Sequence, residues 1–168
     1  MRIERIDPTL SSVRALLEQS DQYMAALYPS ESNHLESVDD LCRPNVVLLG
    51  CMIDGELAAC GAVKLIDDGE ERYGEIKRLF VGAPYRRRGI SAALMERLEQ
   101  RLVEAGVGVA RLEVGVSQPE ALSLYRGLGY VERSRFGAYG PDPLSVFMEK
   151  KLPSRSSVAA LAARRSLL

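Results

Sequence analysis

Three adjacent arginines, Arg86, Arg87 and Arg88, stand directly before Gly89 in a chain that is otherwise nearly neutral. Apolar residues follow at helical spacing, so Gly89 is expected to open a helix. The first turn of a helix leaves backbone N–H groups unpaired, and these donors together with the helix dipole bind anions such as phosphate. Glycine has no Cβ and lets a phosphate approach closely. The local pattern indicates either a phosphate site or a loop of solvated arginines.

Two familiar phosphate-binding loops do not fit the residues around Gly89. No Gly-Lys-[Ser/Thr] sequence follows to supply the lysine and the hydroxyl of a P-loop. The G-x-G-x-x-G spacing of a dinucleotide-binding turn is missing as well. An anion site at this position would therefore use the helix terminus and the arginines.

The composition limits the partners of the chain. It has 168 residues, with 22 basic and 23 acidic side chains and a net charge of −1. This balance argues against nucleic acid as the main partner, since such binding relies on uncompensated cations. No apolar run approaches the roughly 20 residues of a membrane span, and the amino terminus has no apolar signal segment. We expect a cytoplasmic protein that binds neither nucleic acid nor membrane.

The cysteines do not indicate a metal site. Cys42, Cys51 and Cys60 form no C-x-x-C pair, and His34 is the sole histidine. A zinc site with the usual close ligand spacing is therefore not expected. An odd cysteine count without a signal segment fits a reducing compartment, where Cys51 and Cys60 would be small buried apolar side chains.

Hydrophobic periodicity predicts the elements that must position these residues. Strands are expected at 2–6, 46–53, 57–66, 75–81, 110–114 and 145–149, with another beginning at 130–131, and helices at 11–27, 35–41, 90–105 and 119–129. The Asp54-Gly55 turn joins two strands into an antiparallel hairpin. The strand–helix–strand–helix order over 75–131 predicts a parallel pair within a mixed sheet.

The tail over 153–168 differs from the rest of the chain. It is rich in Ser, Ala and Arg, and its Val158, Leu161, Arg165 and Leu168 are compatible with a short amphipathic helix. Such a helix would dock on the body or on a partner, and a frayed end is the alternative. We therefore expect a single domain over 1–152 followed by this tail, with a homodimer as one use of the tail and of the exposed sheet edges.

The segment from Val81 to Leu94 resembles the pyrophosphate-binding loop of the GNAT superfamily of acetyl-CoA-dependent N-acetyltransferases. Arg86, Gly89 and Ser91 occupy the fixed positions of the family pattern [QR]-x-x-G-x-[GA]. Ser91 replaces the usual Gly or Ala with another small residue.

A second segment, from Ala121 to Tyr130, is similar to the family motif A-x-x-L-Y-x-x-x-G-[FY]. Three residues before Ala121 the family often has Asn, and this chain has Gln118. The two motifs together identify residues 1–152 as a GNAT domain, and the wider pattern resembles bacterial members that act on small molecules.

The resemblance implies an α/β fold with a mixed, mostly antiparallel sheet, splayed central parallel strands and flanking helices. Acetyl-CoA, the acyl donor, would lie where the strands at 75–81 and 110–115 separate. The implied cofactor contacts are Leu79, Phe80 and Val81 through their backbone, then Arg86, Arg87, Arg88, Gly89, Ile90, Ser91 and Ala92 around the pyrophosphate, and Gln118.

Acyl transfer to an amine needs a group that takes a proton from the ammonium and one that gives a proton to the thiolate. The resemblance implies that Glu75 is the base and Tyr125 the acid. Without it, Glu75 would be interpreted as a carboxylate paired with a nearby cation, and Tyr125 as a packing residue. Strand alternation would place Glu75, Lys77 and Leu79 on one face and the residues between them on the other.

Four further residues are expected at the acceptor side of the site. They are His34 in a polar loop after the first helix, Lys77, and Tyr139 and Ser145 in a Gly/Pro-rich segment before the last strand. Loops of this kind often carry specificity. Glu113 either faces the same cleft or pairs with a neighbouring cation.

The sequence therefore predicts an enzyme that moves acetyl from acetyl-CoA to a small-molecule amine by direct attack in a ternary complex. Acidic residues in the early helices would suit a cationic acceptor. The alternatives are a peptide or protein amine as acceptor, or a non-catalytic acyl-CoA-binding module, against which the presence of both Glu75 and Tyr125 argues.

Overall fold

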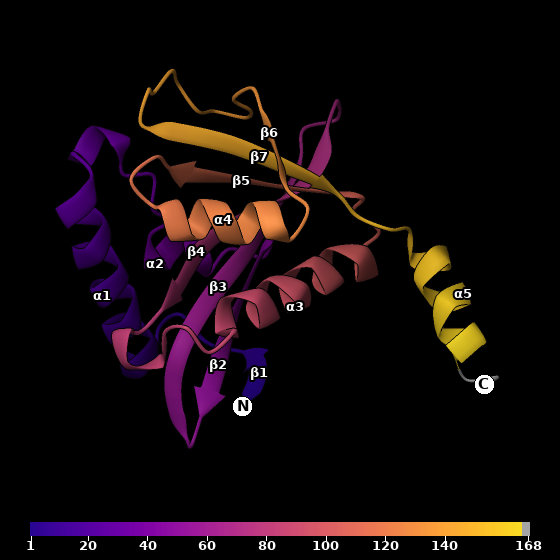
Figure 1. The fold of residues 1–168 in the computed structure, drawn as a ribbon, viewed down its shortest axis with the longest axis horizontal. Coiled ribbons are helices and arrows are strands. Elements are labelled where there is room, and N and C mark those ends of the chain that lie inside the picture. The colour runs from indigo at the N-terminus through magenta and orange to yellow at the C-terminus, as the bar shows by residue number, and fades with distance from the viewer. Residues whose placement is uncertain (166–168) are drawn as a thin grey trace.

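The structure, a computed structural model, describes residues 1–165 as one seven-stranded sheet with helices on both faces (Figure 1). The strands lie in the order β1-β2-β3-β4-β5-β7-β6. Their bounds are β1 Arg2–Arg5, β2 Val46–Ile53, β3 Glu56–Asp67, β4 Arg72–Val81, β5 Val109–Gly115, β6 Val131–Arg133 and β7 Ser145–Lys151. Every neighbouring pair is antiparallel except β4 and β5, which confirms the mixed, mostly antiparallel sheet.

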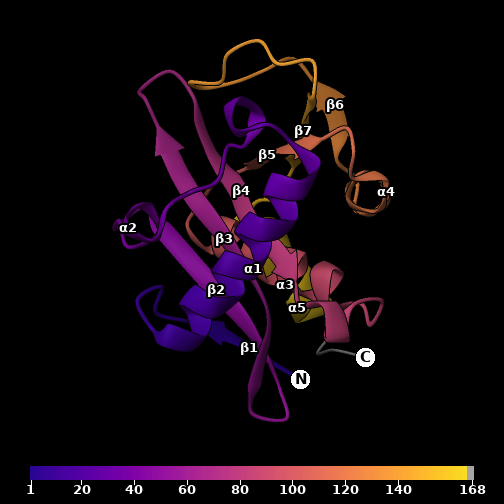
Figure 2. The same ribbon diagram turned by 90° about the vertical axis from the view of Figure 1, so that its left-hand side faces the viewer.

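The helices divide between the two faces. They are α1 Ser11–Leu27, α2 Val38–Leu41, α3 Ile90–Glu104, α4 Pro119–Gly127 and α5 Arg155–Arg165, with short 3-10 turns at Ser30–Ser32 and Ala83–Tyr85. Figure 2 shows α1 running across β3 and β4 on the face opposite α3. The expected helix over 35–41 begins later, at Val38, because the Ser37 hydroxyl accepts a hydrogen bond from the Asp40 N–H and caps it there.

The parallel pair of β4 and β5 is short. It joins Gly74, Glu75 and Ile76 to Ala110, Arg111 and Leu112, and no pairing follows between the remaining residues of the two strands. Beyond that point the strands separate, as the splayed arrangement requires. The separation leaves the C-terminal half of β4 without strand pairing on its β5 side.

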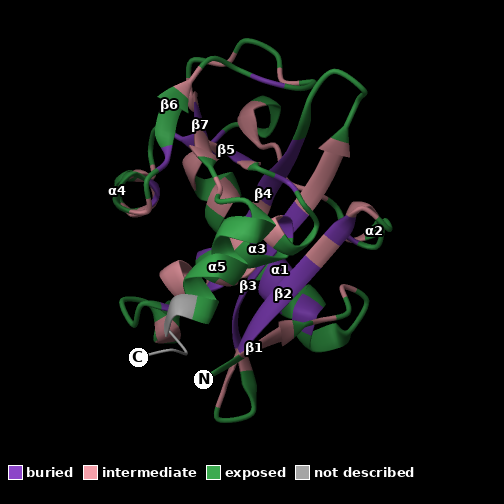
Figure 3. Cartoon of the chain, turned by 90° about the vertical axis from the view of Figure 1, so that its right-hand side faces the viewer, coloured by how far each residue is buried: buried purple, intermediate pink, exposed green. Residues whose placement is uncertain are grey.

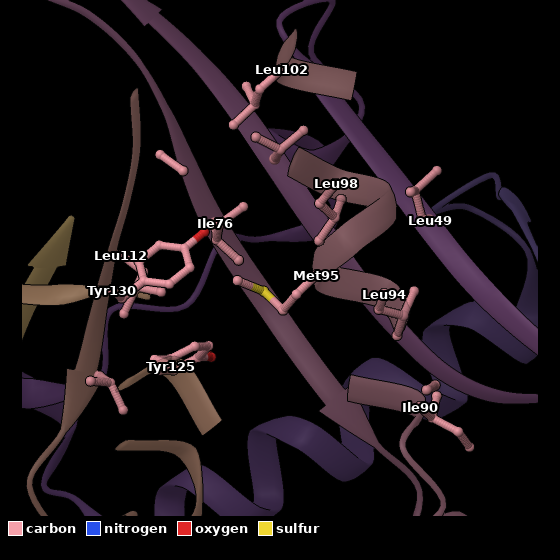
Figure 4. Packing of buried hydrophobic residues seen from close by; sticks show 14 of the residues in the cluster. Leu49, Ile76, Ile90, Leu94, Met95, Leu98, Leu102, Leu112, Tyr125 and Tyr130 are labelled. Atoms are coloured by element: carbon pink, nitrogen blue, oxygen red, sulfur yellow. The ribbon is translucent and has the colours of Figure 1, made fainter. Parts of the chain in front are cut away.

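The main core lies between the sheet and the helices α3 and α4. Figure 4 shows Leu94, Leu98 and Leu102 of α3 pointing at the sheet, with Ile76 and Leu112 from the parallel strands beside them. These five side chains are almost completely buried. The apolar stripe read from the sequence therefore fixes α3, and with it Gly89, against the central strands.

A smaller core lies on the other face, beneath α1. Val13, Leu16 and Leu17 of this helix pack on Cys60 of β3 and Phe80 of β4. Both buried cysteines, Cys51 and Cys60, are fully covered and free of disulfides, as expected of small apolar side chains.

A β-bulge in β4 overturns the simple alternation expected for that strand. Arg78 has a φ of +56°, and the pairing with β3 shifts by one residue between Cys60 and Ala62. Lys77 and Arg78 consequently point to the same face, with the Arg78 guanidinium donating to Asp21 and to the Leu17 carbonyl of α1. Leu79 packs instead in the α3 core. The expectation that Leu79 shares a face with Glu75 and Lys77 was therefore wrong, because the extra residue of the bulge reverses the alternation after it.

The tail forms the expected helix, but it does not dock on the body. Figure 1 shows α5 projecting away from the sheet, and Figure 3 colours most of the helix as exposed. Val158 is 45% exposed and Leu161 60% exposed. Leu168 lies outside the described residues. Within residues 1–165, no helix is both long enough and apolar enough to cross a membrane.

Candidate active site

A cavity of about 560 Å³ opens between the end of β4, the first turn of α3, and α4. Side chains from distant parts of the sequence meet there. Its lining residues are Tyr23, Leu79, Phe80, Val81, Tyr85, Arg86, Arg87, Gly89, Ile90, Ser91, Ala92, Gln118, Glu120, Ala121, Leu124 and Tyr125. The cavity thus brings together every predicted cofactor contact except Arg88, together with the predicted acid Tyr125.

Gly89 gives the first turn of α3 its form. It is the N-cap of the helix and has a φ of +74°, a left-handed conformation that glycine adopts without strain. No side chain of the described chain caps this helix end. A Cβ built at Gly89 would meet nothing within 4 Å. The unpaired N–H groups of this turn therefore border an open space that an anion can enter.

The three arginines have different surroundings. Arg86 donates from Nε to the Val81 carbonyl at 3.1 Å, and its guanidinium lies 5.2 Å from the centre of the Tyr23 ring. Arg87 also lines the cavity. Arg88 turns away from it, donating to the Pro84 carbonyl at 3.1 Å. Two of the three arginines, Arg86 and Arg87, thus line the cavity.

Helix α4 supplies Tyr125 to the cavity. Tyr125 is only 8% exposed, and among the described residues no group is hydrogen-bonded to its hydroxyl. Burial raises the pKa of Tyr125 well above the ordinary value, and the charge of Glu113 raises it further. The phenol therefore stays protonated through the neutral range, as a proton donor must.

Tyr28 connects the end of α1 to the start of α4, and sequence reasoning missed it. Its hydroxyl accepts from the Ser117 N–H at 3.1 Å and donates to the Gln118 side-chain oxygen at 3.2 Å. The ring lies over Gly115 so closely that a Cβ there would come within 1.9 Å of the hydroxyl. No local sequence pattern indicates a role for Tyr28, because its hydrogen-bond partners lie about 90 residues away. A glycine at position 115, where a side chain would clash with Tyr28, is the sequence feature that reflects this contact.

A cluster of polar side chains lies where β4 separates from β5, on the face that carries α1. We call Glu36, Glu75, Lys77, Tyr139, His34, Glu113, Asp142 and Ser145 the polar cluster. The Tyr139 hydroxyl donates to Glu75 and accepts from Lys77 at 2.8 Å. Lys77 also donates to the His34 carbonyl at 3.1 Å and lies 3.5 Å from the Glu75 carboxylate.

The remaining members of the polar cluster contact one another or Lys77. Ser145 donates to Glu113 at 2.8 Å, and the His34 ring lies 3.5 Å from the Asp142 carboxylate. Glu36 lies 3.7 Å from Lys77. All four predicted acceptor-side residues and the predicted base therefore meet in one place, although they come from four separate parts of the chain. Sequence reasoning gave Glu36 and Asp142 no specific role here, since each lies in a loop without a motif.

Glu113, a member of the polar cluster, also acts electrostatically on the cavity. Its charge raises the pKa of Tyr139 in the cluster and of Tyr125 in the cavity. Its hydrogen-bond partner is the neutral hydroxyl of Ser145, and the charges of His34 and Lys77 also act on it. The cavity is lined by Leu79, Phe80 and Val81 of β4, and Lys77 of the polar cluster lies two residues before Leu79 on the same strand.

Comparisons with known proteins show which family the chain belongs to. The acetyltransferase (GNAT) family model matches residues 13–130. An IAA acetyltransferase from Azospirillum brasilense is 43% identical over 150 residues, which cover 89% of this chain and 97% of the relative.

Solved structures share the fold. A Klebsiella pneumoniae protein named as an acyl-CoA N-acyltransferase is 33% identical, with a TM-score of 0.75 over 90% of this chain and 97% of that one. The PaiA N-acetyltransferase of Thermoplasma acidophilum, in complex with coenzyme A, is 19% identical, with a TM-score of 0.68 over 89% of this chain and 98% of that one. The chain therefore belongs to the GNAT acetyltransferase family and is an acyltransferase that uses acetyl-CoA as its donor.

Proposed function

We propose that this protein acetylates the amine of a small-molecule acceptor by direct attack on acetyl-CoA in a ternary complex. One observation carries the proposal: beyond the last β4–β5 pair, Ile76 with Leu112, the polar-cluster residue Lys77 and the cavity residues Leu79, Phe80 and Val81 follow one another along β4. Donor and acceptor can therefore reach a common point from opposite sides. The IAA acetyltransferase relative, at 43% identity, supports a small molecule as acceptor.

In this proposal the donor occupies the cavity. The pantetheine arm pairs with the backbone of Leu79, Phe80 and Val81, which β5 leaves unpaired, as an added strand, with the Val81 carbonyl also held by Arg86. The pyrophosphate lies at the first turn of α3, where Gly89 to Ala92 present N–H groups and Arg86 and Arg87 supply charge. The thioester then points toward the separation of the two strands.

The chemistry needs one proton removed and one supplied. Tyr125, buried and protonated, donates to the departing thiolate. A carboxylate of the polar cluster takes the proton of the acceptor ammonium, and the family resemblance gives this role to Glu75. His34, Lys77, Tyr139 and Ser145 surround the amine.

Release of the free CoA thiol tests the proposal. The protein is incubated with acetyl-CoA and a panel of amines that includes small diamines, amino acids and peptides. We expect a small amine to accelerate thiol release and to appear as its N-acetyl product by mass spectrometry. Acceleration by peptides alone would transfer the function to a peptide acceptor. Tight acetyl-CoA binding with no acceleration by any amine would refute catalysis and favour a binding module.

The Tyr125→Phe variant tests the proposed acid. We expect kcat to fall about 10²-fold or more, the usual contribution of a positioned acid or base, while acetyl-CoA affinity is retained. Tyr130→Phe is the matched control, since Tyr130 is also buried but directs its hydroxyl to Glu99 at 3.0 Å. Equal rates for the two variants would remove Tyr125 from the mechanism.

A further inference from the structure

We propose that Glu113, rather than Glu75, accepts the proton of the acceptor ammonium, and that Glu75 is a positioning residue. This inference rests on the proposed function and identifies one further catalytic group within it. It departs from the role that the resemblance gives to Glu75. The argument comes from where each carboxylate lies along its strand and from what already contacts it.

The two carboxylates differ in their position relative to the strand separation. Glu75 lies inside the paired stretch, opposite Arg111. Glu113 directly follows Leu112, the last residue of β5 that pairs with β4. Glu113 is therefore the first β5 residue at the gap, where the thioester lies in the proposed complex. Glu75 is set back along β4 by about two residues, or roughly 7 Å at the rise of a strand.

The neighbours of the two carboxylates differ as well. Glu75 accepts the hydrogen bond of Tyr139 and lies 3.5 Å from the ammonium of Lys77. Its side chain is 8% exposed, so it is enclosed by these partners. Glu113 accepts a single hydrogen bond, at 2.8 Å, from the neutral hydroxyl of Ser145, and its second oxygen has no partner in the described part of the chain. Glu113 thus has an oxygen available for an incoming ammonium.

The electrostatics agree with this geometry. Burial raises the pKa of Glu113 above the ordinary value, and the hydrogen bond from Ser145 opposes the shift. The charged groups that face it are Lys77 of β4 and His34 before α2, which lower the pKa, and Asp142 before β7, which raises it. The phenols of Tyr28, Tyr125 and Tyr139 face it from the end of α1, from α4 and from the loop before β7. A carboxylate whose pKa lies nearer neutrality is a better-matched general base.

The step balances with the groups already named. The ammonium gives one proton to Glu113, and the nitrogen electron pair then forms the C–N bond to the thioester carbonyl. The C–S bond breaks with its electron pair on sulfur, and the thiolate takes the proton of Tyr125. The nitrogen releases a second proton, which restores Tyr125, and Glu113 returns its proton to solvent.

Glu75 acts through its neighbours in this scheme. Its carboxylate holds the Tyr139 hydroxyl and lies against Lys77, which in turn donates to the His34 carbonyl. The loop that carries Tyr139 and the loop that carries His34 are thereby fixed around the acceptor. Loss of Glu75 should therefore weaken acceptor binding more than it slows the chemical step.

The pH dependence of thiol release, measured with the best acceptor, distinguishes the two carboxylates. Glu113→Gln should lower kcat about 10²-fold or more and abolish the acidic limb of the kcat profile, with acetyl-CoA affinity retained. Glu75→Gln should raise the acceptor KM and keep the acidic limb. Ser145→Ala removes the hydrogen bond that lowers the pKa of Glu113, so the acidic limb should move to higher pH.

The outcomes separate this inference from the proposed function. Amine-dependent thiol release by the wild type, together with a Glu113→Gln variant within threefold of it, would refute the role of Glu113 and leave the proposed function intact. Loss of the acidic limb in Glu75→Gln would return the role to Glu75. If Glu113→Gln fails to fold, the Ser145→Ala shift decides: an unmoved limb refutes the inference. A wild type that no amine accelerates refutes the proposed function itself.

Discussion

Gly89→Glu is the sharpest test of the cofactor site, because the structure separates its effects. Gly89 has a φ of +74°, so any L-residue there is held in the left-handed region. A Cβ meets nothing within 4 Å, so no clash arises in the free protein. The new carboxylate would project into the space where the first turn of α3 receives the pyrophosphate. The substitution therefore strains the backbone slightly and repels the ligand.

The two effects have different magnitudes and readouts. The left-handed conformation should cost about 1 kcal/mol of stability, which lowers Tm by about 2–4 °C for a chain of this size. A carboxylate at roughly 6 Å from a pyrophosphate of charge about −2 is repelled by about 2 kcal/mol at an effective dielectric constant between those of protein and water. We therefore expect the Kd for coenzyme A to rise about 30-fold. The loss should shrink at high salt, because salt screens exposed charges.

Gly69→Glu is the matched control. Gly69 also has a positive φ, of +86°, and open space around its Cβ, but it lies in the turn between β3 and β4, outside the cavity. Isothermal titration with coenzyme A and thermal unfolding are measured on both variants. Both should lose similar stability, and Gly89→Glu alone should lose affinity. Equal affinity in the two variants would refute the placement of the pyrophosphate at α3.

Three further predictions concern stability. Gly74→Ala brings a Cβ to 2.1 Å from the Leu102 side chain and should lower the free energy of unfolding, measured in urea, by about 1–3 kcal/mol. Leu102→Ala alone should cost about 2–5 kcal/mol, and the double variant should cost less than the sum of the two single variants. Strictly additive losses would contradict the contact. Arg111→Met removes a buried guanidinium that holds Glu71 and Glu149, and should cost about 3 kcal/mol at neutral pH. A hydrogen bond from Arg111 lowers the pKa of Glu71. Burial alone would raise the pKa of Glu149, but the hydrogen bonds from Arg111 and Arg133 outweigh it and lower this pKa. The stability that Arg111 contributes through these carboxylates is therefore present above the unfolded pKa near 4.5 and is lost as the pH falls through the pKa values of the folded protein. The difference between wild type and Arg111→Met should therefore narrow in acid, and a constant difference would refute the linkage. Removal of residues 153–168 keeps Leu152, which packs against the core. Because α5 is exposed, this truncation should change Tm by no more than about 2 °C. A large drop in Tm would show that the tail stabilises the domain.

Most secondary structure could be predicted from the chain because burial leaves a periodic trace. The stripe of Ile90, Leu94, Leu98 and Leu102 defined α3, and the apolar runs defined β2 and β3. Boundaries were less certain where a polar side chain decides them, as Ser37 does for α2. The bulge at Arg78 left no trace in the periodicity, since it depends on the pairing of β4 with β3 and on the contact of Arg78 with α1.

The candidate site also has features that the sequence predicts and features that depend on tertiary packing. The glycine and arginines of the α3 terminus were predictable from the sequence, because an anion site at a helix start is built from consecutive residues. The sequence did not determine that Arg88 turns away to Pro84, nor that Tyr139 reaches Glu75 across 64 residues. Which carboxylate lies at the gap between β4 and β5 could be seen from the folded chain alone. That property depends on where two strands stop pairing, and pairing between distant segments is a matter of packing rather than of local sequence.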